Sequence, residues 1–234
     1  MSGWTDEEIT QLRGASLRAD DSLPALVHGR LDGAPLQMVG DGLLGVLARG
    51  ATQTAVDVAL ECAAALRHRD WEGDAELADQ LAAAGTEGPT PMLRVLAVDL
   101  DMVSLALHAD PMMGESRIDV RTGQWRVADL GDDLDDDDLD DDERWLYLEP
   151  VGSRDSYRDM EVFISTVDDP GIADRLEIAI TGRGAFRRFK DVLSRWPDER
   201  SRYFVMRDER ELGRARAWLA ARGYRPAWAR STNP

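Results

Sequence analysis

The sequence predicts a mainly helical α+β protein, in which an N-terminal helical domain precedes a small antiparallel sheet packed against about four C-terminal helices. Three observations lead to this prediction. Apolar residues recur at helical spacing through the first 85 residues. A hairpin signal with glycine at its turn follows at residues 116–127. Beyond residue 150, helical spacing returns in four successive segments.

The N-terminal helices are predicted from their start signals and their periodicity. Thr5 is followed by three acidic residues, a pattern typical of a capped helix start. Residues 51–67 and 71–84 then place apolar residues every three to four positions, with a short polar turn between them. These two segments predict a helical hairpin.

A turn-rich segment, residues 85–91, marks the predicted domain boundary. It separates a helical N-terminal domain, residues 1–88, from a second α+β domain, residues 92–228. The second domain contains an acidic loop at residues 129–143.

The second domain begins with a predicted strand at residues 92–98 and a helix at residues 100–109. The hairpin follows, and residues 144–148 alternate as a further strand. The remaining chain predicts four helices, whose boundaries are marked by Ser153, by Asp169 with Pro170, by Pro197 and by Gly223.

Charge is distributed unevenly along the chain. The net charge is −17, yet residues 182–234 hold fourteen Lys and Arg against six Asp and Glu. Eleven acids fall within residues 129–143. Such a loop can be merely solvated, can collect divalent cations weakly, or can cover the basic helices and imitate a polyanion. It lacks the spacing of an EF-hand, so no dedicated metal site is predicted.

Several classes of protein are not supported by the composition. No apolar run approaches the roughly 18 residues of a membrane helix, and the chain opens with acids, so we expect a cytoplasmic protein without membrane contact. Cys62 lies in an apolar segment and is expected in the core, without a disulfide. The three histidines, His28, His68 and His108, are isolated in the sequence, and no cofactor motif accompanies them.

One segment favours an enzyme. An apolar strand before Asp99 and Asp101 is similar to the strand by which phosphohydrolases of the haloacid dehalogenase type present a nucleophile and a general acid. Those enzymes need further carboxylates for Mg²⁺ and a cation for the phosphate, which this sequence does not place nearby. The simpler interpretation makes Asp99 the N-cap of the following helix, with Asp101 in its first turn.

The basic segment at residues 180–196 combines arginines with aromatic residues. At helical spacing its apolar residues share one arc, so the rings should face the core and not stack on bases. The opposite face is the predicted contact surface, and it consists of Arg183, Arg187, Arg188, Lys190 and Arg195. Arginines of the next helix are expected to extend this surface: Arg202, Arg207, Arg210, Arg214, Arg216 and Arg222.

These features favour a non-enzymatic cytoplasmic binding or regulatory module that contacts a protein partner through its Arg-rich helical face. A nucleic-acid-binding protein using the same face is the main alternative, because such a patch can neutralise phosphates. A metal-dependent phosphohydrolase that uses Asp99 and Asp101 is the third. The sequence predicts no catalytic residues, no cofactor and no metal site for the favoured function.

The order of these motifs resembles that of the bacterial uncharacterised protein family 0158, over roughly residues 93–224. The resemblance implies no established activity, catalytic residue or cofactor, and it leaves the first 90 residues as a separate helical extension. The segments that carry it are residues 118–123, the acidic loop, and residues 145–150, 156–163, 182–191 and 217–219.

Overall fold

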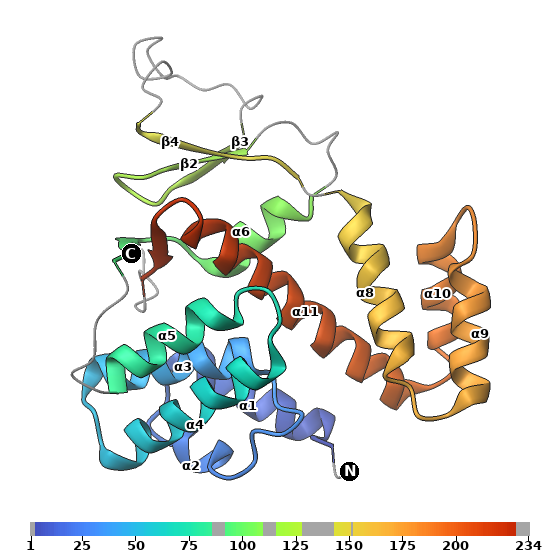
Figure 1. Ribbon diagram of the computed structural model, residues 1–234, viewed down its shortest axis with the longest axis horizontal. Coiled ribbons are helices and arrows are strands. Elements are labelled where there is room, and N and C mark those ends of the chain that lie inside the picture. The colour runs from blue at the N-terminus through green and yellow to red at the C-terminus, as the bar shows by residue number, and fades with distance from the viewer. Residues whose placement is uncertain (1–2, 86–91, 110–115, 128–142, 151, 228–234) are drawn as a thin grey trace.

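The computed structural model describes residues 3–85, 92–109, 116–127, 143–150 and 152–227, and it confirms the mainly helical α+β class (Figure 1). Five helices come first, and a strand, a helix and a three-stranded sheet follow. The N-terminal helices are α1 (Asp6–Arg18), α2 (Leu23–Val27), α3 (Leu36–Arg49), α4 (Gln53–Arg69) and α5 (Asp74–Gly85).

Four helices and a last strand complete the described chain (Figure 1). The strands are β1 (Arg94–Leu96), β2 (Ser116–Asp119), β3 (Trp125–Val127), β4 (Trp145–Leu148) and β5 (Tyr224–Pro226). The other helices are α6 (Leu100–Leu107), α8 (Ser153–Ser165), α9 (Pro170–Ile180), α10 (Ala185–Leu193) and α11 (Pro197–Ala220).

The N-terminal helices surround one apolar core. Thr5 and Glu8 form the predicted capping box of α1, in which each side chain accepts a hydrogen bond from the backbone N–H of the other residue. Thr52 caps α4 by accepting from the N–H of Ala55. Cys62 is buried in this core, as predicted. The leucines that are at most 1% exposed there are Leu12, Leu23, Leu43, Leu44, Leu66, Leu77 and Leu81.

The long helix α11 contacts both halves of the protein. It packs against α3 and α5 on one side and against α6, α8, α10 and β5 on the other (Figure 1). Gly213 allows α11 to approach the N-terminal helices closely, because a Cβ atom at this position would lie only 2.1 Å from the carbonyl oxygen of Glu72. The first predicted domain therefore packs directly on the last helix of the second.

Two small sheets lie in the second predicted domain. β2 pairs antiparallel with β3 and with β4, which confirms the predicted hairpin and the strand after it. β1 pairs in parallel with β5, with Arg94 opposite Tyr224 and Leu96 opposite Pro226. The sequence prediction missed β5, whose three residues carry no alternation of their own. Its strand conformation depends on pairing with β1, a segment more than a hundred residues earlier.

The four predicted C-terminal helices are all present. Asp169 caps α9 by accepting from two backbone N–H groups, as predicted. The predicted cap at Ser153 is wrong, since Gly152 with φ 74° precedes α8 and Ser153 is its first helical residue. Helices α8, α9 and α10 and the start of α11 enclose another core, in which the rings of Phe163, Phe189 and Tyr203 meet edge to face.

Replacement of Gly213 by alanine tests the close approach of α11 to the N-terminal helices. The added Cβ would meet backbone atoms that cannot move aside alone, so we expect a loss of about 1–3 kcal/mol of unfolding free energy. Gly14, in the middle of α1, is the control. Its Cβ would touch only the flexible side chain of Arg18, so Gly14→Ala should gain up to about 1 kcal/mol. Urea denaturation measures both, and equal effects would contradict the packing.

Candidate functional site

The predicted basic residues are present at and beside α10, and they are exposed. Arg187 and Lys190 lie on α10, Arg183 precedes it and Arg195 follows it, and we call these four residues, all but Arg188, the α10 basic face. Arg187 is 90% exposed and its contact with Asp191 of the same helix is long, at 3.8 Å. The apolar stripe is buried or half-buried on the other side, as predicted: Ala185, Phe186, Phe189, Val192, Leu193 and Trp196.

Arg188 is the exception. Its guanidinium folds back and donates hydrogen bonds to the carbonyl oxygens of Thr181 and Arg183, beyond the end of α9. Gly182 and Gly184 have φ angles of 78° and 76°, a conformation that glycine adopts easily and that reverses the chain here. Arg188 is exposed, but its guanidinium group closes the C-terminal end of α9.

The expectation that the arginines of α11 extend this surface is wrong for three of them. The side chains of Arg210, Arg214 and Arg216 are 18%, 8% and 1% exposed, because carboxylates and an amide inside the fold hold their guanidinium groups. Arg207 is 30% exposed and pairs with its neighbours Asp208 and Glu211. Only Arg202 and Arg222 of the predicted extension are exposed.

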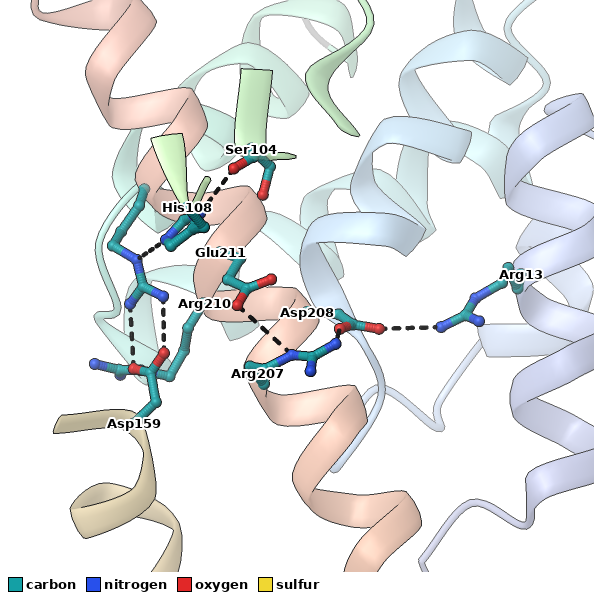
Figure 2. A network of polar contacts seen from close by, with 9 residues as sticks. Arg13, Ser104, His108, Asp159, Arg207, Asp208, Arg210 and Glu211 are labelled. Atoms are coloured by element: carbon teal, nitrogen blue, oxygen red, sulfur yellow. Dashed lines mark hydrogen bonds and ion pairs between the residues drawn. The ribbon is translucent and has the colours of Figure 1, made fainter. Parts of the chain in front are cut away.

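Asp159 of α8 binds two of the buried arginines. Its carboxylate has no exposed surface, and it accepts a hydrogen bond of 2.5 Å from Arg210 and two bonds of 2.7 and 3.1 Å from Arg214 (Figure 2). These arginines compensate the charge of Asp159, since a buried carboxylate without partners is strongly unfavourable. This cluster joins α8 to α11.

Arg214 also binds His108, at the end of α6. Its Nε donates to the Nε2 atom of His108 over 3.0 Å, and the Nδ1 atom lies 2.8 Å from the carbonyl oxygen of Ser104 (Figure 2). An arginine N–H can only donate, so Nε2 is the acceptor and Nδ1 carries the proton. His108 is isolated only in the sequence, because its partner comes from a helix about a hundred residues later.

A second buried network joins α11 to the N-terminal helices. The carboxylate of Glu209 accepts from the backbone N–H groups of Gln37 and Met38, at 2.6 and 3.0 Å, and from Arg69 at 3.0 Å. The N-cap residue of α3 is Pro35, whose side chain makes no capping bond. Glu209 therefore caps α3 from another helix, where its charge also suits the positive end of the helix.

Arg216 extends this network. It donates to the Gln37 amide at 2.8 Å and to the Asp41 carboxylate at 2.7 Å. Asp74 accepts from Gln37 and from Arg69, so the acids and bases form one connected set. Glu209 and Arg216 lie two turns apart on the buried side of α11. Two charged residues two turns apart, beside apolar residues on the same face of the helix, are the sequence signal that was not recognised.

A groove of about 1270 Å³ opens between α1 and α3 on one side and α6 and α11 on the other. Asp99, Asp101, Asp208 and Glu211 line it. Asp99 accepts from the N–H of Asp101 at 2.9 Å and is the N-cap of α6, as predicted. Across the groove, Arg13 of α1 approaches Asp208 to 3.5 Å (Figure 2).

Glu211 is the least well compensated carboxylate of those in Figure 2. Its side chain is 21% exposed, and its ion pair with Arg207 has an N–O separation of 3.6 Å. Burial raises the pKa of Glu211 above its ordinary value, and Arg207 opposes this effect only in part. A carboxylate kept in such a place is a candidate for function.

Within the described ranges, no set of residues is arranged for metal binding or for thiol chemistry. No three His, Cys, Asp or Glu side chains there are grouped to hold a metal ion. The acidic loop lies outside the described residues except for Glu143. Burial raises the pKa of the Cys62 thiol, which keeps it protonated. No described helix has the length and apolar character to cross a membrane.

A comparison with known protein families shows to which family the chain belongs. A family model described as Uncharacterised protein family (UPF0158) matches residues 117–234, just over half of the chain. The chain belongs to this family. No curated protein and no solved structure matches it. The UPF0158 segment contains Asp159, Glu209 and Arg216, whereas the residues that Glu209 and Arg216 bind lie in the N-terminal helices outside the match.

Substitution of Glu209 by alanine tests the network that joins these parts. It would leave Arg69 and the start of α3 without their buried partner, so we expect a loss of about 3–5 kcal/mol of unfolding free energy. Glu161→Ala, at an exposed position of α8, should change stability by less than about 0.5 kcal/mol. Guanidinium denaturation of both variants gives the comparison; a mild effect at Glu209 would show that the cap is unimportant.

Glu211→Gln tests the environment of Glu211. Because the folded pKa is raised, the ionised group lowers stability above that pKa, and the effect disappears below the unfolded value of 4.5, where both states are protonated. At pH 7 the variant should therefore be at least as stable as the wild type, with the difference shrinking toward about pH 4. Thermal unfolding at several pH values measures this. A variant that is clearly less stable at pH 7 would contradict it.

Proposed function

We propose that this protein is a bacterial, cytoplasmic and non-enzymatic binding module that holds an acidic protein partner through the α10 basic face. The observation that carries the proposal is the division among its arginines. Arg210, Arg214 and Arg216 have carboxylate partners inside the fold, whereas Arg187 extends into solvent with 90% of its side chain exposed. Cations left in solvent on and beside one helix are available for charge recognition.

The size of the surface favours a protein partner over nucleic acid. The α10 basic face provides four cations, fewer than the phosphate contacts of a typical nucleic-acid site, and the chain as a whole carries a net charge of −17. Phe189 is buried and Phe186 half-buried, so neither offers an open ring for a base to stack on. A local acidic patch on another protein matches these properties better.

The position of Asp99 supports the non-enzymatic part of the proposal. Its carboxylate is engaged as the N-cap of α6, a structural role that accounts for its place in the sequence. His108 is likewise engaged at both ring nitrogens, by Arg214 and Ser104. Within the described residues, the groups that resemble catalytic residues have structural partners.

A charge reversal on α10 tests the proposal. The double variant Arg187→Glu with Lys190→Glu should lose a partner that the wild type retains from the extract of its host, by several-fold at low salt, because reversed charges repel an acidic surface. Arg154→Glu with Arg158→Glu, at two exposed positions of α8, makes the same change in net charge and should retain the partner.

Quantitative mass spectrometry of the bound proteins compares the three forms. Equal recovery from both double variants would refute the contact surface. If RNA or DNA is retained by the wild type and lost only from the α10 variant, the partner is a nucleic acid and the protein proposal is wrong.

A further inference from the structure

The groove between α1, α3, α6 and α11 is too large for a typical small ligand. Its volume is about 1270 Å³, whereas small-molecule sites usually measure roughly 300–1,000 Å³. Four helices from both halves of the chain line it, and the buried networks of Glu209 and Asp159 hold α11 in place beside it. A preformed groove of this size suits a segment of polypeptide.

Two exposed leucines line the groove from different helices. Leu105 of α6 is 63% exposed and Leu17 of α1 is 45% exposed. Single exposed leucines are common, but these two line the same groove. Val205 and Leu212 of α11 also line it and are half-buried. The groove therefore offers contacts for apolar side chains of a bound segment.

The wall formed by α6 and α11 is acidic. Asp99, Asp208, Glu209 and Glu211 all line it. Burial raises the pKa of both glutamates, and Glu211 has the longer ion pair of the two, at 3.6 Å against 3.0 Å. Of the arginines that line the groove, Arg49 donates to Asp21 and to the carbonyl oxygen of Arg18. Arg13 lies 3.5 Å from Asp208, and Arg18, which is 69% exposed, lies 3.9 Å from Asp20. Burial is unfavourable for a single charge such as that of Glu211, but it strengthens the attraction within a charge pair. A cationic group of a ligand would therefore complete the environment of Glu211.

We propose that this groove binds an amphipathic peptide segment of a partner protein, with leucine-like side chains against Leu17 and Leu105 and a lysine or arginine at Glu211. The segment would lie in the groove as helical ligands do elsewhere, with apolar anchors on one face and a charge at the edge. The site is separate from the α10 basic face, and it attracts a ligand of the opposite charge.

The first test uses a fluorescein-labelled amphipathic peptide of leucine and lysine at helical spacing, with full-length protein and fluorescence anisotropy. Leu105→Arg should weaken binding of this peptide by roughly tenfold or more, because it removes an apolar contact and repels the lysines. Ile178→Arg is the matched control. It makes the same change at a 74% exposed position of α9, away from the groove, and should leave the affinity unchanged.

The second test concerns the charge. Glu211→Gln should weaken binding of the leucine–lysine peptide by roughly tenfold, whereas Glu177→Gln, at an exposed position of α9, should not. A peptide with glutamate in place of lysine should not bind. Circular dichroism confirms that each variant is folded, and Glu211→Gln is expected to be stable.

Equal weakening by the two arginine variants, or by the two glutamine variants, would overturn the proposal, since attraction to the acidic protein in general would explain it. So would tight binding of the glutamate peptide. The α10 charge reversal uses other residues and another readout, so each proposal can fail without the other.

Discussion

The carboxylate of Glu209 is the contact on which the arrangement of the two halves depends. It lies on α11 and completes the start of α3, a helix that has no side-chain cap of its own. Gly213, one turn further along, permits the backbone of α11 to approach that of Glu72 closely. Arg216 donates to the side-chain oxygen of Gln37 and to the carboxylate of Asp41. Because these charges are buried, neither half satisfies them alone.

This dependence changes how the family segment is to be regarded. The UPF0158 match begins at residue 117, after β1 and α6, yet β5 pairs with β1 and α11 packs on α6. The matched segment therefore uses structure from outside its own limits. The N-terminal helices, which the sequence suggests as a separate extension, supply the partners of two of its buried charges, Glu209 and Arg216.

Local signals in the sequence predicted local structure well. The capping box at Thr5, the caps at Asp99 and Asp169, the hairpin and the apolar stripe of α10 all depend on residues within a few positions of one another. The arginines of α11 were misplaced for the opposite reason. On a helix, Arg214 and Arg187 have the same local preference, and only a distant carboxylate such as Asp159 makes one of them buried. Partners of this kind cannot be found from periodicity.

The separation of the Glu209 and Arg216 contacts along the chain has a consequence for the order of folding. Gln37 lies 172 positions from Glu209 and 179 from Arg216, so these bonds close very long loops. Closing such loops is entropically unfavourable, and proteins rich in distant contacts fold slowly. The acidic N-terminal part and the basic C-terminal part attract each other before any specific bond exists. The uneven charge of the chain thus acts as a guide that brings its ends together, and salt should slow that approach.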